Sequence, residues 1–343
     1  MKTRAFVALE LVLGGALATL GGLAVVGGVW PPTYVWATVV GLALAVAMEW
    51  LTTPVTAYWR HSREPEPTVE SYFVDERGVK RPFPSLAADP ASVALSVVVP
   101  AFNEERRLPR TLEETVAALE KRRERDASST WEVIVVDDGS RDGTADVVRA
   151  YTDRHTAERV RLLRLAKNHG KGGAVMKGVL RARGERVLMM DADGATRFSD
   201  LAALEASLAD LARAHPDGGV VCGSRYHMQL ADAALKRDPL RGFVSFVFHV
   251  LNSVLVPGGV RDTQCGFKLF SRAAARRIFP RQKMWGWSFD CELLFLARDL
   301  PVAEVAVQWT DVPGSTLSVV TASLEMTRDL LLLRAMYGSG LWR

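Results

Sequence analysis

A stretch of 38 residues, Leu11–Met48, carries no charged side chain. At 1.5 Å per residue, a single helix of this length would extend roughly 57 Å, about twice the apolar thickness of a bilayer. The pair Pro31-Pro32 interrupts the stretch near its middle, and prolines end a helix because they remove backbone donors and fix φ. The sequence therefore predicts a membrane anchor over residues 1–60, a hairpin of two transmembrane helices near residues 5–30 and 33–51.

Basic residues flank this anchor, with Lys2 and Arg4 before it and Arg60 and Arg63 after it. Basic flanks tend to stay on the cytosolic side of a membrane, so both ends of the hairpin and the chain that follows are expected in the cytosol. The alternative is a cleaved signal peptide, but the apolar core of a signal peptide has only about 7–15 residues. The stretch is too long for that, and we expect an integral membrane protein.

The organisation changes after the anchor. Residues 61–92 are polar and contain five prolines, which predicts an extended linker. Beyond it, apolar runs rich in β-branched residues alternate with segments of helical periodicity. This alternation indicates an α/β fold, a mostly parallel sheet with helices on both faces. The expected strands are 95–99, 132–136, 160–165, 186–190 and 219–222, and the expected helices are 108–125, 143–155, 172–183 and 201–214.

Acidic residues follow two of these strands. Asp137 and Asp138 come directly after one, and Asp191 and Asp193 come after another. Ligands bind sheets of this class at the carboxyl ends of the strands. Carboxylates just beyond buried strands are costly unless they are paired, hydrogen-bonded or bound to a cation. We therefore predict that Asp191 and Asp193 hold Mg²⁺ or Mn²⁺ together with a diphosphate.

Several functions are excluded. The glycine-rich turn 168–173 precedes a helix, as phosphate-binding loops do. It has Gly172 where a Walker loop needs Ser or Thr, and Val175 where a dinucleotide loop needs glycine. The net charge of +4, from 43 Lys+Arg against 39 Asp+Glu, is too small to suggest a nucleic-acid partner. Three widely spaced cysteines exclude a disulfide scaffold and a zinc ribbon.

Three segments, Ser96–Glu105, Val133–Ser140 and Met189–Gly194, resemble the family 2 glycosyltransferases, which have the GT-A fold and an Asp-x-Asp metal site for a nucleotide sugar. Six spaced motifs narrow the resemblance to the dolichyl-phosphate β-glucosyltransferases. It runs from about Arg81 to the C-terminus, so residues 93–343 are expected to form the GT-A domain. This family has one N-terminal membrane segment, whereas two are expected here. The six motifs are Asn168–Ala174, Asp191–Thr196, Cys222–Arg225, Arg261–Lys268, Trp287–Leu294 and Gly340–Arg343.

The resemblance implies transfer of glucose from UDP-glucose to dolichyl (polyprenyl) phosphate with inversion. The products would be UDP and dolichyl β-D-glucosyl phosphate, a lipid-linked glucose donor for protein N-glycosylation. A phosphate monoester is largely a dianion at neutral pH and is already a nucleophile, so no strong general base is needed. Positioning and metal stabilisation of the UDP leaving group should lower the barrier.

The resemblance also implies roles for individual residues. Asp191 and Asp193 would hold the metal, with diphosphate or water completing the site because Ala195 stands where related mannosyl-phosphate synthases have Gln. The implied catalytic residues are Asp193, Arg225 and Asp290. Nucleotide-sugar binding is implied for Pro100, Phe102, Glu104, Asp137, Asp138, Lys171 and Asp191. Acceptor-phosphate binding is implied for Arg225, Arg237, Arg241, Gln264 and Lys268, with Asp262 shaping the same pocket.

Two further segments are candidates for helices in the membrane interface, near residues 240–257 and 323–337. The first contains the apolar run Phe243–Val256, which is too short to span a bilayer and follows basic residues. The second places Leu330–Leu333 between Arg328 and Arg334. A core helix is an equally good interpretation of either segment.

Two other functions stay open at this point. One is a polyprenyl-phosphate mannosyltransferase that uses GDP-mannose, and the other is a membrane scaffold that binds a nucleotide without catalysis. Asp191 and Asp193 argue against the scaffold. The membrane would be the endoplasmic reticulum in a eukaryote and the plasma membrane in a bacterium.

Overall fold

The computed structural model of the chain describes residues 32–63, 67–228, 260–310, 312 and 319–342. Two compact units make up the chain, Met1–Arg60 and His61–Arg343. Helix α2 (Pro32–Arg63) starts near the beginning of the expected helix 33–51 but continues well beyond it, with Pro54 inside. The expected helix near 5–30 lies outside the described residues. Among the described residues, no helix is both long enough and apolar enough to cross a membrane.

A seven-stranded sheet forms the centre of the second unit, in the order β5-β4-β3-β6-β8-β7-β9. Its strands are β3 (Val93–Ala101), β4 (Trp131–Asp137), β5 (Val160–Arg164), β6 (Gly184–Met190), β7 (Val220–Ser224), β8 (Phe267–Ser271) and β9 (Val302–Ala306). Only β8 runs against its neighbours β6 and β7, and the other paired strands are parallel. The mostly parallel α/β sheet predicted from the sequence is therefore confirmed.

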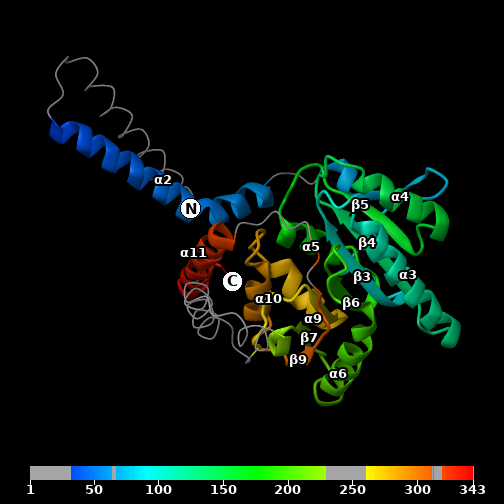
Figure 1. The fold of residues 1–343 in the computed structure, drawn as a ribbon. Coiled ribbons are helices and arrows are strands. Elements are labelled where there is room, and N and C mark those ends of the chain that lie inside the picture. Colours follow the sequence, from blue (N-terminus) through cyan, green and yellow to red (C-terminus); the bar gives the residue numbers. More distant parts are fainter. Residues whose placement is uncertain (1–31, 64–66, 229–259, 311, 313–318, 343) are drawn as a thin grey trace. The chain divides into compact units, whose positions relative to one another are not determined.

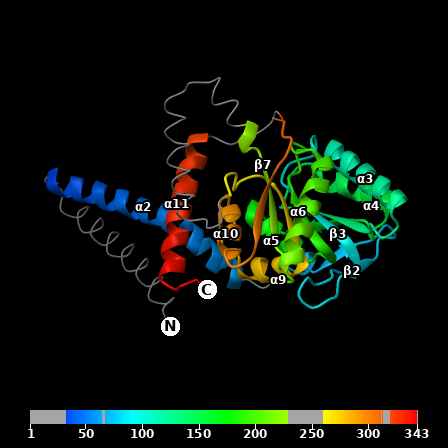
Figure 2. The ribbon, with the colours of Figure 1, turned by 90° about the horizontal axis from the view of Figure 1, so that it is seen from below.

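Helices cover both faces of this sheet (Figures 1 and 2). On one face lie α3 (Leu108–Arg125), α4 (Thr144–His155) and α6 (Leu201–Ala214), and on the other lie α5 (Lys171–Val179), α9 (Arg272–Ile278) and α10 (Phe289–Leu296). Successive residues of a strand point to opposite faces. Val97 and Val99 accordingly pack in one core with leucines of α3 and α6, whereas Val98 meets α5 at Gly178.

Helix α11 (Val319–Gly338) packs against α10, where the rings of Tyr337 and Phe295 are 4.7 Å apart. Both ribbon views show the two helices side by side (Figures 1 and 2). This helix covers the expected segment 323–337. The other expected interface segment, 240–257, lies outside the described residues. Two short 3₁₀ turns also belong to this unit, η2 (Phe198–Asp200) and η3 (Phe279–Arg281).

Residues 67–92 do not form the extended linker that their composition predicts. They contain η1 (Thr68–Glu70) and an antiparallel pair of strands, β1 (Tyr72–Val74) and β2 (Lys80–Pro82). The segment then packs on the domain, because the Leu86 amide donates to the carbonyl of Leu180 and Arg272 donates to the carbonyls of Leu86 and Asp89. Composition misleads here because the polar backbone groups find partners in the folded domain.

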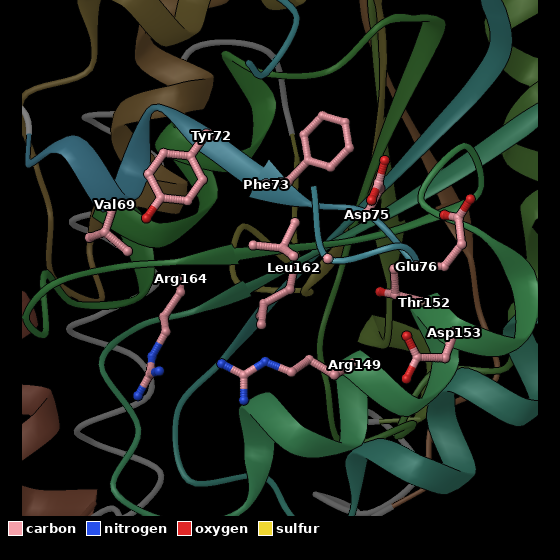
Figure 3. A pocket seen from close by; sticks show the side chains of 12 residues that line it. Val69, Tyr72, Phe73, Asp75, Glu76, Arg149, Thr152, Asp153, Leu162 and Arg164 are labelled. Carbon is pink, nitrogen blue, oxygen red and sulfur yellow. The ribbon is translucent and has the colours of Figure 1, made fainter. Parts of the chain in front are cut away.

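A pocket of about 400 Å³ opens where this segment meets the edge of the sheet (Figure 3). Val69 and Tyr72 come from the N-terminal segment, Arg149 and Asp153 from α4, and Arg164 from the end of β5. The pocket is thus built by the segment expected to be a linker, next to the strand ends where the acidic residues lie.

Candidate active site

The carboxyl ends of β3, β4 and β6 lie side by side, because β3 pairs with β4 on one side and with β6 on the other. Ala101 at the end of β3 is in register with Asp137 at the end of β4. The two loops that follow these strands are joined. The Asn103 amide donates to Oγ of Ser140 and the Glu104 amide donates to Oγ1 of Thr144. The segments that follow β3 and β4, residues 102–105 and 138–144, therefore form one continuous rim at this edge of the sheet.

Asp137 provides a buried acceptor at this rim. Its side chain is 1% exposed, and Oδ1 accepts a hydrogen bond from the amide of Ser140. Oδ2 has no hydrogen-bond partner within the described parts of the chain, and Nε of Arg164 lies 3.9 Å away. A buried carboxylate oxygen without a donor is costly. Oδ2 is therefore suited to accept an N–H group of a ligand, as expected for a uracil ring.

Pro100 and Phe102 flank this position at the end of β3. Pro100 is partly buried within the strand, whereas the Phe102 ring is 45% exposed. An exposed aromatic ring beside a buried acceptor can stack on a planar base. The placement is compatible with the predicted nucleotide contacts of both residues.

Asp138 faces away from this position. Its Oδ1 accepts from the amide of His169 at 2.7 Å and its Oδ2 accepts from the amide of Gly170 at 2.9 Å. Burial raises the pKa of this carboxyl to about 7. We predicted a nucleotide contact for Asp138, but both of its oxygens hold the glycine-rich turn. It therefore positions the start of α5.

That turn delivers Lys171 to the acidic pair. Gly170 adopts φ +83°, and Lys171 is the first residue of α5. The Nζ of Lys171 lies 2.6 Å from Oδ1 of Asp191, which follows β6. Burial alone would lower the pKa of Lys171, but the charges of Asp191 and Asp290 outweigh it and raise this pKa. Lys171 is therefore a protonated cation beside the predicted metal ligands.

The space around Asp191 is tight. Gly266, just before β8, lies so close that a Cβ at this position would be 2.1 Å from Oδ2 of Asp191. Asp193 is partly exposed, and its Oδ1 accepts from the amide of Ala195, which leaves Oδ2 available for a ligand. Asp191 is thus held by its neighbours, while Asp193 offers an oxygen to the rim.

Glu104 adds a third carboxylate near this pair. Its two oxygens accept from Nε and Nη2 of Arg107, at 2.7 and 2.5 Å. Burial raises the pKa of Glu104 even though Arg107 lowers it, and the charges of Asp193 and Asp191 raise it further. Glu104 therefore lies within electrostatic reach of the acidic pair. In the described parts of the chain, no three His, Cys, Asp or Glu residues cluster closely enough to hold a metal by themselves.

Lys268 and Asp290 form a buried ion pair near Lys171. Lys268 lies in β8 with no exposed surface, and its Nζ donates to Asp290 and to the carbonyl of Cys265. The charge of Asp290 outweighs the effect of burial and raises the pKa of Lys268 above its ordinary range. The resemblance placed Lys268 on the acceptor phosphate. Its ammonium instead holds Asp290, whose charge also acts on Lys171.

Arg225 is held in a similar way by Asp262. The Nε and Nη2 of Arg225 donate to the two oxygens of Asp262, at 2.8 and 2.9 Å, and the Arg225 amide also donates to Asp262. The guanidinium lies 5.5 Å from the Trp309 ring centre. We expected this fork to hold phosphate, but two of its nitrogens are bonded to Asp262. Within the described residues, Nη1 and the second N–H of Nη2 on the outer side of the guanidinium are left for an anion.

The remaining predicted residues lie towards α11. Nε2 of Gln264 is 3.3 Å from the sulfur of Met326 in α11. Glu292 is fully buried and accepts hydrogen bonds from the amides of Lys283 and Met284 and from the Tyr337 hydroxyl. Burial raises the pKa of Glu292 to about 7. Glu292 thus fixes the Trp-containing turn against α11.

Arg237 and Arg241 lie outside the described residues. Three residues at the site have no role assigned from the sequence: Arg107, which pairs with Glu104, and Glu70 and His169, which support the glycine-rich turn. A signal for Arg107 exists, since it lies three positions after Glu104, just before α3. No local sequence pattern predicts the role of Glu70, because its partners are about a hundred residues away along the chain.

Comparison with known proteins places this geometry in a family. The model of glycosyl transferase family 2 matches residues 96–279. The chain is 42% identical over 322 residues to a dolichyl-phosphate beta-glucosyltransferase of Homo sapiens, covering 91% of this chain and 97% of that protein. It is 45% identical over 276 residues to the protein of the same name in Mus musculus, covering 80% of this chain and 85% of that protein.

A likeness to a solved structure is weaker. The glucosyl-3-phosphoglycerate synthase from Mycobacterium tuberculosis in complex with UDP superposes with a TM-score of 0.48 at 19% identity, covering 72% of this chain and 82% of that chain. The family model and the two relatives establish the family without this structure. The chain belongs to glycosyl transferase family 2 and, within it, to the dolichyl-phosphate β-glucosyltransferases.

Proposed function

We propose that this chain transfers glucose from UDP-glucose to dolichyl phosphate, with inversion at the anomeric carbon. The observation that carries the proposal is the pairing of a buried acceptor, Asp137, with the cluster of Lys171, Asp191 and Asp193 two strands away. Neighbouring strands are about 4.8 Å apart, so these groups are separated by roughly 10 Å. A nucleoside diphosphate is long enough to reach from one to the other.

The residues fit a divalent cation. Asp191 and Asp193 offer carboxylate oxygens, which are the donors that Mg²⁺ and Mn²⁺ prefer. Mg²⁺ sites commonly use one or two carboxylates and leave the remaining positions to phosphate and water, so a pair is enough. When bound, the metal would neutralise negative charge on the diphosphate leaving group.

The protein's own groups account for the other requirements of the reaction. Lys171 places a second positive charge beside the acidic pair, where the diphosphate would lie. Arg225 follows β7 at the same edge of the sheet, and the outer side of its guanidinium would orient the acceptor phosphate. A phosphate oxygen of the acceptor attacks the anomeric carbon, the bond from that carbon to UDP breaks, and UDP leaves with the electron pair. No proton has to be removed from a dianionic acceptor.

We also propose that the reaction takes place at a membrane, with residues 1–60 as an anchor and the second unit in the cytosol. The uncharged stretch 11–48 supports the anchor. Exposed Leu324 and Leu331 on α11 support contact of that helix with the bilayer surface. In a eukaryotic cell this membrane would be the endoplasmic reticulum.

A donor panel tests the proposal. Full-length protein in detergent with Mg²⁺ or Mn²⁺ is given dolichyl phosphate and labelled UDP-glucose, UDP-galactose or GDP-mannose, and the organic phase is counted. Label should enter the lipid from UDP-glucose alone. Label from GDP-mannose would indicate a mannosyltransferase, and nucleotide binding without any transfer would indicate a scaffold.

A further inference from the structure

Glu70 is a fully buried carboxylate in the segment before the sheet, outside the part of the chain that the family model matches. Its Oε2 accepts from Nζ of Lys177 at 2.5 Å. Its Oε1 accepts from the amide of Ala166 at 3.0 Å and lies 3.6 Å from Nε2 of His169. The Glu70 carbonyl accepts two hydrogen bonds from Arg181. Glu70 thus contacts the turn before α5, the Lys177 side chain within α5 and the Arg181 side chain just after α5.

The turn between β5 and α5 is held from two directions. Asp138 of the neighbouring strand end binds the amides of His169 and Gly170, while Glu70 binds the amide of Ala166 and faces the His169 ring. Gly139 also packs closely, since a Cβ there would be 2.9 Å from the amide nitrogen of Asn168. The turn therefore has little freedom while both carboxylates are in place.

The charge on Glu70 is maintained by these contacts. Burial alone would raise its pKa, but the nearby His169 ring and the hydrogen bonds from Lys177 and Ala166 outweigh burial and lower the pKa to about 2. A buried ion pair contributes little net stability, because desolvation offsets much of the attraction. The arrangement is better explained by the geometry that it imposes on the turn and on Lys171, which follows the turn directly.

We propose that Glu70 is a positioning residue for the nucleotide sugar: through Ala166 and His169 it fixes the turn that presents Lys171 to Asp191 and to the diphosphate. The identity of the ligand in this inference rests on the proposed function, whereas the contacts of Glu70 do not depend on it. It gives residues 67–92 a role in donor binding rather than that of a spacer.

Two single variants separate positioning from stability in the full-length protein. Glu70→Ala and Lys177→Met both break the same ion pair, but only Glu70→Ala removes the acceptor for Ala166 and His169. We expect both variants to melt at a lower temperature than the wild type. Only Glu70→Ala should raise the KM for UDP-glucose, by roughly tenfold, with the KM for dolichyl phosphate unchanged. If the KM for UDP-glucose stays at the wild-type value in Glu70→Ala, or rises equally in Lys177→Met, the proposal is overturned.

The double variant Glu70→Ala/Lys177→Met removes both charges of this ion pair and covers the case in which Glu70→Ala does not fold. It should melt at a higher temperature than Glu70→Ala, because Lys177 no longer lies beside a missing carboxylate, and still have the raised KM for UDP-glucose. Recovery of the KM together with the melting temperature would show that Glu70 serves stability alone. As a control in the same segment, Glu76→Ala removes a carboxylate that accepts from the distant Ala157 amide, and it should leave this KM unchanged.

Hydrogen exchange tests the geometry without any ligand. Amides of residues 166–171 should exchange about tenfold faster in Glu70→Ala than in the wild type, while those of β4 keep their protection. Unchanged exchange in the turn would overturn the inference even if the enzyme transfers glucose as proposed. Faster exchange in a protein that transfers no glucose would refute the proposed function and leave the positioning of the turn by Glu70 in place.

Discussion

The ammonium group of Lys171 lies 2.6 Å from a carboxylate oxygen of Asp191. The contact joins two elements that are separate in the sequence, the glycine-rich turn before α5 and the acidic segment after β6. It keeps a positive charge at the place where the nucleotide diphosphate is proposed to bind. The pair also offsets the repulsion among Asp191, Asp193 and Glu104, whose charges act on one another.

Lys171→Met should therefore impair the use of UDP-glucose. The change removes the cation and leaves Asp191 beside other carboxylates, so kcat/KM should fall by about 100-fold. The measurement is steady-state transfer of labelled glucose at varied UDP-glucose. Lys167→Met is the control, because Lys167 is exposed four residues earlier and should tolerate the change. Wild-type kinetics in Lys171→Met would remove Lys171 from the site.

Gly266→Ala tests how tightly Asp191 is held. A Cβ at Gly266 would lie 2.1 Å from Oδ2 of Asp191, so the carboxylate must turn away from Lys171. Activity should fall by about tenfold or more, whereas the melting temperature should change little because a side chain rather than the backbone moves. Gly338→Ala has open space around the new methyl group and should behave as the wild type. Equal activity of the two variants would contradict the packing described here.

The alternation of apolar strands and amphipathic helices predicts most of the fold, because buried parallel strands such as β3 and β4 need continuous apolar runs. β8 is harder to predict. It carries Lys268 in the middle of a buried strand, where the ammonium needs the distant Asp290 as well as the Cys265 carbonyl. Residues 67–92 resemble a linker for the same reason, since Glu70 and Leu86 find their partners far along the chain.

The site shows the same division between local and distant information. Asp137, Asp191 and Asp193 can be predicted because they directly follow strands whose ends must meet. The roles of Asp138, Arg225 and Lys268 cannot be read in this way, because each depends on a partner between 22 and 37 residues away. Such a partner occupies part of a charged group near the site, and only the three-dimensional structure shows which partner that is.

Asp262→Asn tests whether the pair with Arg225 matters for the acceptor. The variant weakens the bidentate contact that fixes the guanidinium, so the KM for dolichyl phosphate should rise and kcat/KM should fall by roughly 10–100-fold. Arg225→Lys keeps the charge but loses the fork, and should have a similar effect. Binding of free UDP, measured by calorimetry, should stay unchanged in both variants. Weakened UDP binding would move Arg225 to the donor side.

The stability of the protein should depend on pH through Glu292. Burial raises the pKa of Glu292 to about 7 in the folded chain, above its ordinary value of 4.5. The folded state therefore binds a proton that the unfolded state has lost, and stability falls as the pH rises from about 4.5 to about 7. Asp138, also with a pKa of about 7, acts in the same direction.

Glu292→Gln removes this contribution, since the amide resembles the protonated carboxyl. Chemical denaturation at pH 5 and pH 8 should show a smaller loss of stability in the variant than in the wild type, by up to about 3 kcal/mol. Identical pH profiles of the two proteins would show that Glu292 is not protonated in the fold.

The acidic pair after β6 is proposed to support glucosyl transfer from UDP-glucose to a lipid phosphate. The most direct measurement is the rate at which labelled glucose enters dolichyl phosphate with full-length wild type and Asp193→Ala, compared at equal amounts of folded protein. Asp193 is partly exposed and its one hydrogen bond given above is to the nearby Ala195 amide, so the variant should fold normally. Its rate should fall by about 100-fold or more, as should that of the wild type in EDTA. A near wild-type rate in Asp193→Ala, or full activity in EDTA, would contradict the account.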